Sequence, residues 1–559
     1  MFHQTLDPVG GSLGLSALCG AIPLIALFVL LGGFRMRAWL AGVIALVLSL
    51  LIAIIAFNMP AGQALLSGTE GAAYGFFPIM WIVVNAIWVY NLTVATGHFA
   101  VLQRSFESVS ADQRIQAIII AFCFGALLEA LAGFGTPVAI TVVMLMALGF
   151  KPLKAATVAL VANTAPVAFG AMAVPITTLA TVANGATNDP RLSIHTIGSM
   201  VGRQTPILAI FVPLILVFIV DGKRGLKQTW LPAIVAGVAF GIGQFVSSNY
   251  ISVTLADIVA SLFSALVLVG FLRLTHAPRN RGVETAEATP AEPATERPGT
   301  APGTAAPTKR DSRRDVTLAY APYLVIIVLF VITNITAVQD KLALEPWTKS
   351  FNWPGLHVYN AAGDAVSTTL FKFNWLPAAG TILLISGLVT MAILRISPAT
   401  AVRTYLRTYV ELRSAIITVM AVLGLAYVMN LSGQTGSLGA WLAGAGSAFA
   451  ILSPILGWLG VAVTGSDTSS NALFGALQVQ TAKQAGIDQV LMAAGNSSGG
   501  VLGKMISPQN LAIAAAAVGM AGQEGTIFRR VFLWSVVMVV FMCVIVGLQS
   551  TGILSWMIP

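Results

Sequence analysis

Residues 115–137 read IQAIIIAFCFGALLEALAGFGTP, and the fold class of the chain can be inferred from them. Residues 115–132 are almost wholly apolar over nearly the length of a membrane-spanning helix, which needs about 20 such residues. One carboxylate, Glu129, interrupts the run, and Gly-Phe-Gly-Thr-Pro at 133–137 follows with residues that break helices. The stretch predicts a membrane helix that carries a charge and ends in a break.

The composition of the whole chain agrees with that prediction. Of 559 residues, 57% are hydrophobic and 9% are charged, against about 45–50% and 25% in soluble proteins. Soluble, disordered, fibrous and disulfide-rich secreted classes are excluded by these proportions. The chain has a net charge of +9. We expect the excess of basic residues to lie in cytoplasmic loops rather than at a nucleic-acid interface. We predict an all-α polytopic membrane protein, with the lipid bilayer as its partner and no nucleic acid.

Apolar stretches of spanning length recur along the chain. They lie at 13–34, 38–58, 72–97, 115–132, 153–174, 196–220, 230–248, 251–272, 317–336, 376–395, 414–431, 438–463 and 527–550. Shorter apolar pieces lie at 136–150, 468–482, 488–503 and 507–522. Depending on how many of these cross, we expect about 12 to 16 transmembrane or re-entrant helices.

Basic residues predict the orientation of the chain. No basic residue precedes the first apolar stretch, whereas Arg35 and Arg37 follow it, so it is read as a retained helix with its N-terminus outside. Residues 1–276 form one membrane half and 317–559 the other, which includes an outer loop at about 337–375. Between them, the Pro/Ala/Thr-rich stretch 277–316 predicts a disordered cytoplasmic linker.

Two windows of the sequence suggest an internal duplication. Residues 163–175 (NTAPVAFGAMAVP) and 496–508 (NSSGGVLGKMISP) share Asn, Gly, Met and Pro at the same relative positions. Together with the sequence around them, the two windows give predicted repeat units at about 115–185 and about 414–522. Counting crossings places the windows in opposite directions, so we predict an inverted repeat, as in many secondary transporters.

Each unit also contains an apolar run broken by small or polar residues, at 133–137 and 465–471. Irregular backbone at membrane depth must be buried in protein or line a wet cavity, and half-helix N-termini there suit an anion. The alternative is that these small residues only permit close helix packing. The candidate substrate-binding residues in and near the breaks are Gly135, Thr136, Asn163, Thr164, Ser469, Ser470, Asn471, Asn496 and Ser497.

Ionisable residues at membrane depth are costly and usually functional. Glu129 lies just before the first break and Asp467 lies inside the second, which makes them candidate proton carriers. Arg203 and Lys504 are candidate partners of a substrate carboxylate. The alternatives are permanent ion pairs for the acids and interfacial snorkelling for the bases.

An enzymatic function is not expected. Residues 495–499 fit G-x-S-x-G, but the surrounding sequence is helical and a nucleophile elbow needs a strand–turn–helix context. The cysteines show no paired or metal-binding spacing, and nothing suggests a cofactor or a domain that hydrolyses ATP. Transport by this chain would be secondary.

Long motifs resemble those of a known family. EALAGFGTPVAI (129–140), NTAPVAFGAM (163–172), VGRQ (201–204), GVAVTGSDTSSNALF (460–474) and GKMISPQ (503–509) are similar to motifs of the bacterial L-lactate permeases, which include glycolate permeases. The resemblance covers nearly the whole chain apart from 277–316 and 337–365. Thr136 stands where alanine is also familiar in that family.

The resemblance implies an inner-membrane symporter that takes up L-lactate, D-lactate and glycolate with protons. Glu129, Arg203, Asp467 and Lys504 all stand inside the matching motifs. Two alternatives stay open at this stage: a sodium-coupled carboxylate transporter with the same architecture, and an anion channel.

Overall fold

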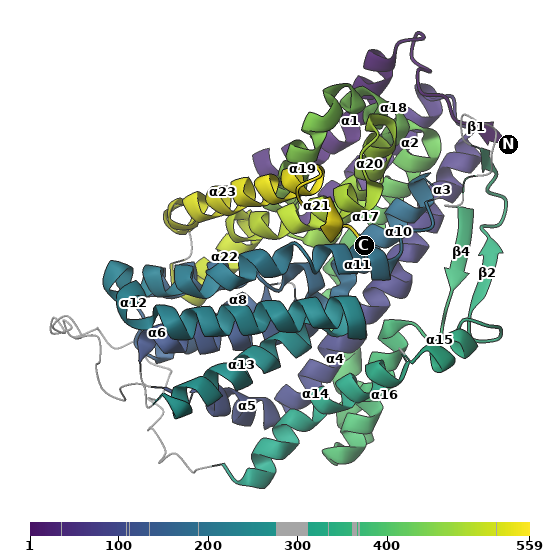
Figure 1. The fold of residues 1–559 in the computed structure, drawn as a ribbon. Coiled ribbons are helices and arrows are strands. Elements are labelled where there is room, and N and C mark those ends of the chain that lie inside the picture. The colour runs from purple at the N-terminus through teal and green to yellow at the C-terminus, as the bar shows by residue number, and fades with distance from the viewer. Residues whose placement is uncertain are drawn as a thin grey trace, which may run out of the picture.

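The computed structural model describes residues 1–34, 36–107, 109–110, 112–133, 135–187, 189–275, 311–333, 335–359, 366, 369–520 and 523–559. Helices dominate it (Figure 1). Those before the central insert are α1 (Leu13–Phe28), α2 (Ala38–Ile55), α3 (Ala61–Tyr74), α4 (Trp81–Ala95), α5 (His98–Glu107), α6 (Gln113–Gln116), α7 (Gly125–Ala132), α8 (Thr136–Ala147), α9 (Pro152–Ala162), α10 (Gly170–Thr187), α11 (Ile194–Val201), α12 (Thr205–Val246) and α13 (Ala256–Leu274). Those after it are α14 (Arg313–Thr333), α15 (Thr336–Leu342), α16 (Ala379–Ile393), α17 (Pro398–Ser432), α18 (Gln434–Leu442), α19 (Phe449–Thr464), α20 (Asp467–Ala485), α21 (Gln489–Gly503), α22 (Pro508–Ala517) and α23 (Glu524–Gln549).

The prediction of an all-α polytopic membrane protein is confirmed. Within the described ranges, 11 helical segments are long and apolar enough to cross a membrane. One of them, Ile194–Ile251, has 58 residues and contains α12, whose backbone leaves the helical conformation at Asp221 and Gly222. A Cβ on Gly241 would lie 3.3 Å from Ile210 Cγ1, so the two arms of α12 pack side by side as a hairpin.

Short strands are the part of the fold that the all-α prediction missed. β1 (Phe2–His3) pairs with β3 (Val358–Tyr359) in parallel, and β2 (Lys349–Asn352) pairs with β4 (Leu370–Phe373) antiparallel. β1 thus holds the N-terminus against the predicted outer loop, on the right-hand edge of the molecule in Figure 1. The predicted linker 277–316 lies outside the described residues except for 311–316, where α14 begins at Arg313.

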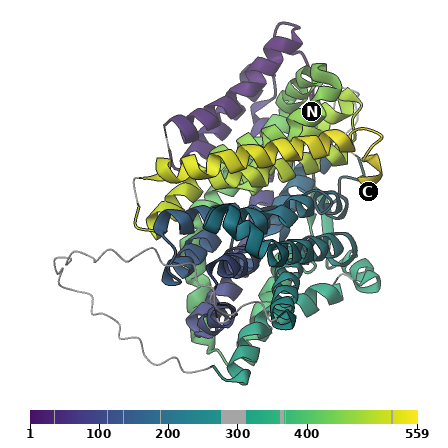
Figure 2. The ribbon, with the colours of Figure 1, turned by 60° about the vertical axis from the view of Figure 1, so that its left-hand side comes forward.

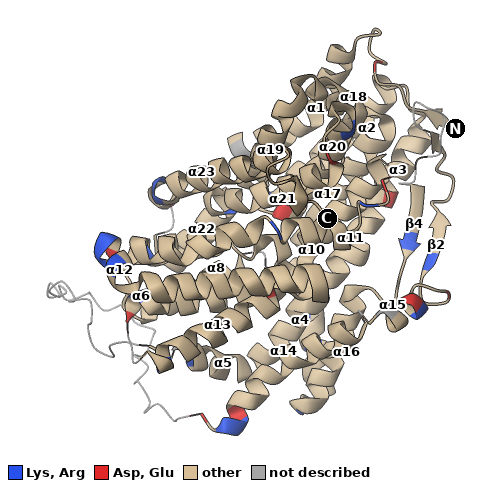
Figure 3. Cartoon of the chain, viewed as in Figure 1, with Lys and Arg blue, Asp and Glu red and all other residues tan. Residues whose placement is uncertain are grey.

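Charged side chains gather toward the ends of the helices. Figure 3 shows most Lys, Arg, Asp and Glu residues at the helix ends and along β2 and β4, with few in the middle of the bundle. On the side of the linker, Arg104 Nη2 lies 2.8 Å from Asp311 Oδ1. This ion pair connects the end of α5 with the chain that enters α14.

Both predicted breaks are present. α7 ends at Ala132 and α8 begins at Thr136, with Gly135 at φ 87° between them. α19 ends at Thr464 and α20 begins at Asp467, with Gly465 at φ 78°. Glycine adopts such positive φ values without steric cost, which is why the chain can turn sharply at both places.

The two windows of the suggested repeat differ in conformation. In the first, α9 ends before Asn163, a 3-10 turn follows at Val167–Phe169, and the backbone is left-handed from Ala171 to Ala173. In the second, residues 496–503 belong to one continuous helix, α21. An inverted relation between the two units therefore remains a prediction.

The segment that carries Glu129 lies at the centre of the protein. It comprises α6, the π-helical stretch Ala117–Phe124 and α7, and its 18-residue apolar window in Gln113–Leu131 is buried in full. The corresponding window of Arg313–Thr333 in α14 is only 28% buried, as expected for a helix at the periphery. Glu129 is thus enclosed by protein and not by lipid.

The two halves of the chain meet along α10 and α20. These helices pack against each other, and α10 also contacts α7. Gly475 permits the approach, because a Cβ there would lie 2.8 Å from Leu179 Cδ1. Figure 2 shows the C-terminal helices stacked on the segments that precede the linker. This contact brings both breaks to one place.

Candidate functional site

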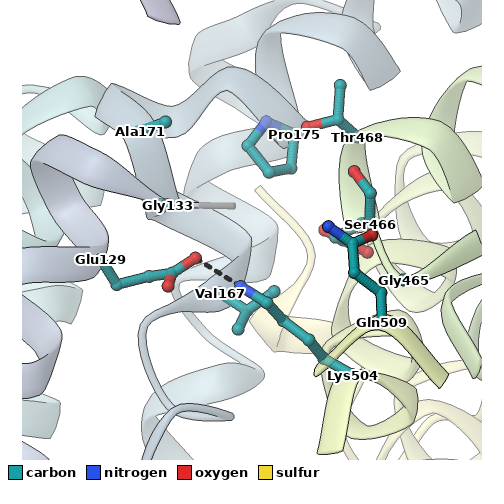
Figure 4. Close-up of a pocket in the computed structure, with 12 residues that line it drawn as sticks. Glu129, Gly133, Val167, Ala171, Pro175, Gly465, Ser466, Thr468, Lys504 and Gln509 are labelled. Atoms are coloured by element: carbon teal, nitrogen blue, oxygen red, sulfur yellow. Dashed lines mark hydrogen bonds and ion pairs between the residues drawn. The ribbon is translucent and has the colours of Figure 1, made fainter. Parts of the chain in front are cut away.

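A cavity lies where the two breaks meet. Its volume is about 40 Å³, enough for a few water molecules. Its polar lining consists of Glu129, Ser466, Asp467, Thr468, Lys504 and Gln509. Its apolar lining consists of Gly133, Val167, Gly170, Ala171, Pro175 and Gly465. In Figure 4, Glu129, Gly133 and Ala171 lie on one side, and Ser466, Thr468, Gln509 and Lys504 lie on the other.

A buried ion pair crosses the cavity. Lys504 Nζ donates to Glu129 Oε1 at 2.6 Å, and the two residues are 6% and 3% exposed (Figure 4). Asn163 Nδ2 donates to the other oxygen, Oε2, at 2.9 Å. Asn163 caps the C-terminal end of α9, so the first irregular stretch directs an amide toward the Glu129 carboxylate. Glu129 thereby has a partner on each oxygen.

Glycine makes room for that carboxylate. A Cβ on Gly170 would lie 2.9 Å from Glu129 Oε1, and a Cβ on Gly133 would lie 3.3 Å from it. Both glycines belong to irregular backbone, at the end of α7 and at the start of α10. The breaks therefore let main chain pack directly against Glu129.

Asp467 is the buried carboxyl group at the second break. It is the first residue of α20 and is 2% exposed. Its Oδ2 accepts hydrogen bonds from Ser497 Oγ at 2.7 Å and from Asn471 Nδ2 at 3.2 Å. Its Oδ1 has no hydrogen-bond partner among the described residues. Asp467 thus differs from Glu129 in having no salt bridge within the described part of the chain.

Asparagine side chains tie Asp467 to both halves. Asn471 Nδ2 also donates to the backbone oxygen of Pro175 at 3.1 Å, and Asn471 Oδ1 accepts from Asn496 Nδ2 at 2.8 Å. Asn496 Oδ1 in turn accepts from Gln478 Nε2 at 3.0 Å. The network fixes the start of α20 relative to α10 and α21.

The predicted site residues fall into three groups. Glu129, Asp467 and Lys504 line the cavity. Asn163, Asn471, Asn496 and Ser497 do not line it and support the two carboxylates from behind. Gly135, Thr136, Thr164, Arg203, Ser469 and Ser470 are outside the cavity lining.

The third group makes contacts elsewhere. Arg203 Nε donates to Asn249 Oδ1 at 3.0 Å and its Nη1 donates to the backbone oxygen of Met557 at 2.7 Å, so Arg203 holds the C-terminal tail. The hydroxyls of Thr164 and Ser470 donate to the backbone oxygens of Val161 and Gly457. These contacts agree with a structural role.

Some lining residues were not predicted. Ser466 and Thr468 lie in the predicted break at 465–471, where their hydroxyls could bind a substrate, whereas Gln509 was not predicted although it stands inside the motif at 503–509. Gln509 is exposed and marks the outer end of the cavity, whereas Glu129 and Asp467 lie at its buried end. Val167, Ala171 and Pro175 lie in the window at 163–175, but as apolar residues they could not be distinguished from packing residues.

The arrangement suits a small organic anion. Lys504 supplies a positive charge that is buried and already engaged by a carboxylate, and a second carboxyl group lies at the same cavity. Hydroxyl and amide groups can accept or donate hydrogen bonds, and the rest of the cavity lining is apolar. Ligand sites commonly combine such an apolar lining with a few placed polar groups.

Comparison with known proteins agrees with this picture. The family model of the L-lactate permeases matches residues 16–552. The chain is 41% identical to the L-lactate permease of Bacillus subtilis, covering 100% of this chain and 99% of the relative. It is 43% identical to the glycolate permease GlcA of Escherichia coli, covering 99% of each. It is 39% identical to the Escherichia coli L-lactate permease, over 100% of each.

Solved structures are more distant. The YdaH transporter of Alcanivorax borkumensis aligns with 86% of this chain and 87% of its own, at 12% identity and a TM-score of 0.47. MtrF of Neisseria gonorrhoeae aligns with 87% of this chain and 84% of its own, at 13% identity and a TM-score of 0.46. The sequence relatives and the family model decide the assignment: the chain belongs to the L-lactate permease family.

Proposed function

We propose that this chain is a secondary transporter that takes up L-lactate, D-lactate and glycolate together with protons across a bacterial inner membrane. The names of its relatives support lactate and glycolate as substrates. The observation that carries the coupling is the ion pair of Lys504 and Glu129 inside the cavity between the two breaks. A substrate carboxylate and Glu129 compete for the same ammonium group.

Competition for Lys504 couples binding of the substrate anion to uptake of a proton. When the substrate carboxylate replaces Glu129 beside Lys504 Nζ, the Glu129 carboxylate loses its cation. A buried unpaired charge is very unfavourable, so Glu129 takes up a proton. One negative charge and one positive charge have then entered the cavity, and its net charge is unchanged. Release on the other side reverses both steps and restores the pair.

Asp467 is the second candidate proton carrier. Its Oδ2 is held by Ser497 and Asn471, and within the described residues it has no ion pair that would have to break for a proton to be gained or lost. One proton per lactate would be electroneutral and driven only by the pH gradient. A second proton, on Asp467, would move one net charge, worth about 2.3 kcal/mol per 100 mV.

The positions of the N-terminal strand and of the chain beside the linker support an orientation with the N-terminus outside and the linker in the cytoplasm. The N-terminal strand pairs with residues of the predicted outer loop, and Arg104 pairs with Asp311 beside the predicted cytoplasmic linker. In Figure 1 the two features lie on opposite sides of the molecule. An outside N-terminus and a cytoplasmic linker are therefore mutually consistent. A cysteine placed near each feature and labelled from one side tests the assignment.

The decisive experiment is uptake of labelled L-lactate by the purified protein in liposomes, with the pH gradient and the voltage imposed separately. We expect a pH gradient alone to drive accumulation. Uptake driven by a sodium gradient alone would replace this proposal with a sodium-coupled transporter. Conduction without saturation or counterflow would indicate an anion channel. A response to voltage would identify the two-proton form.

A further inference from the structure

The backbone beside the cavity is left-handed over three successive residues. Ala171, Met172 and Ala173 have φ values of 45°, 58° and 58°. Residues other than glycine rarely adopt this region, because Cβ approaches the following carbonyl oxygen. Left-handed residues that are not glycine usually occur singly, and such strained backbone is concentrated at functional sites.

The left-handed turn touches both halves of the site. Gly170, just before it, packs against the Glu129 carboxylate. Pro175, just after it, accepts a hydrogen bond from Asn471, which also bonds Asp467. The conformation of the turn is thus fixed between the two carboxylate networks, and the direction of its side chains is fixed with it.

Of the three left-handed residues, only Ala171 lines the cavity. It retains 5% exposure, whereas Met172 and Ala173 are fully buried in the protein. The Ala171 Cβ lies 3.8 Å from the position a Cβ on Gly133 would take. Figure 4 shows Ala171 on the side of Glu129 and Gly133, opposite Ser466 and Gln509.

We propose that the methyl group of Ala171 sets the upper size limit for the substituent at C2 of the substrate. This inference rests on the proposed function, because it takes the substrate to be a small 2-hydroxy acid. Lys504 and the polar groups of the opposite wall bind the carboxylate and the hydroxyl group. The C2 substituent then points toward the apolar lining at Ala171.

The cavity is small enough for one methyl group to matter. A volume of about 40 Å³ corresponds to a few water molecules, so the cavity must widen around the anion and has little spare room at C2. In a hydrophobic pocket, one methylene group changes discrimination by about 10–200-fold. We expect the hydrogen at C2 of glycolate and the methyl group of lactate to be accommodated beside Ala171. The ethyl group of 2-hydroxybutyrate meets it.

The test compares Ala171→Gly with Ala173→Gly. Both substitutions relieve strain at one left-handed residue, since glycine accepts positive φ, but only the first removes a group from the cavity wall. Counterflow of labelled L-lactate and of labelled 2-hydroxybutyrate is measured in liposomes without any ion gradient. We expect Ala171→Gly to raise the ratio of 2-hydroxybutyrate to lactate by about tenfold or more, and Ala173→Gly to leave it unchanged.

A second variant tests the effect of a larger side chain at position 171. Ala171→Ser adds one heavy atom, so it should lower lactate counterflow relative to glycolate counterflow. An unchanged ratio in Ala171→Gly with intact lactate counterflow overturns this inference and leaves the proposed function in place. Equal changes in Ala171→Gly and Ala173→Gly also overturn it, because strain and not size would then be responsible. Absence of lactate counterflow in the unaltered protein refutes the proposed function and this inference together.

Discussion

Lys504 Nζ lies 2.6 Å from Glu129 Oε1, and this bond joins positions 375 residues apart in the chain. It connects the helix before the first break with the 3-10 turn Lys504–Ile506 that follows α21. Both partners are buried. The ion pair therefore has structural as well as functional consequences, and these can be separated by substitution.

Removing one partner of the pair should destabilise the protein more than removing both. Lys504→Met leaves the Glu129 charge buried without its cation, which costs about 3–5 kcal/mol in comparable pairs. The double variant Glu129→Gln with Lys504→Met leaves no unpaired charge and should recover most of the loss. Thermal unfolding in detergent measures both. Equal destabilisation by the single and double variants would contradict the pair's role.

Glu129→Gln should bind lactate more tightly and couple it less well to protons. The amide no longer competes for Lys504 as a charged group, and a hydrogen bond to a charged group contributes about 1.5–3 kcal/mol. We expect the Kd for lactate to fall by about tenfold or more and to lose most of its pH dependence. Binding is measured by calorimetry at several pH values. A weaker affinity in the variant would argue against competition at Lys504.

Asp467→Asn should retain lactate counterflow and lose accumulation driven by a pH gradient, if Asp467 carries the coupled proton. Glu70→Gln is the matched control. Glu70 is also buried and its carboxyl oxygens have no hydrogen-bond partner among the described residues, but it does not line the cavity. Full accumulation in Asp467→Asn would remove Asp467 from the coupling role.

Gly170→Ala should impair transport by displacing Glu129. Gly170 has φ −61° and ψ 155°, which alanine can adopt, so the effect comes from the Cβ, 2.9 Å from Glu129 Oε1. Gly270→Ala in α13 is the control, since nothing lies within 4 Å of its Cβ and alanine favours a helix by about 1 kcal/mol over glycine. Lactate uptake should fall in the first variant and persist in the second.

An ion pair near the ends of α10 and α21 predicts a pH effect on stability. Burial raises the pKa of Asp189, but hydrogen bonds and charge from Arg191 outweigh this and hold the pKa below the usual 3.8. A lowered carboxyl pKa stabilises the fold above the unfolded-state value, and this contribution disappears as the pH falls through the lowered value. Arg191→Gln should therefore reduce the Tm slightly at pH 7, and thermal unfolding at several pH values should show the deficit vanish as the pH falls through the lowered pKa of Asp189.

Sequence reasoning located the charged part of the site because charges are rare at membrane depth. Glu129, Asp467 and Lys504 could be found in this way, and Gly135 and Gly465 marked the breaks where two helices end. Arg203 is likewise a charged residue near apolar sequence. Its side chain, however, donates a hydrogen bond to the backbone oxygen of Met557 and does not line the cavity. Only the folded chain reveals a contact between such distant positions.

The apolar parts were beyond sequence reasoning for a different reason. Val167 and Ala171 resemble any spanning residue, so nothing in the sequence separates a cavity wall from a packing surface. Glu70 was not predicted as a buried charged residue, because the apolar stretch was expected to begin at 72. In the structure α3 begins at Ala61, and Glu70 is completely buried. The predicted start of this apolar stretch was therefore wrong, although the stretch itself is present.

The position of Glu129 in the chain also matters while the protein is being made. The segment Gln113–Leu131 is enclosed by helices that lie on both sides of it in the sequence. At about 5–20 residues per second, the ribosome needs roughly 20 to 75 s to add the 375 residues that separate Glu129 from Lys504. During that time the carboxyl group has no cation from Lys504, so the nascent chain must shelter it by other means. Substitutions at Glu129 can therefore change the yield of inserted protein before they change any transport rate.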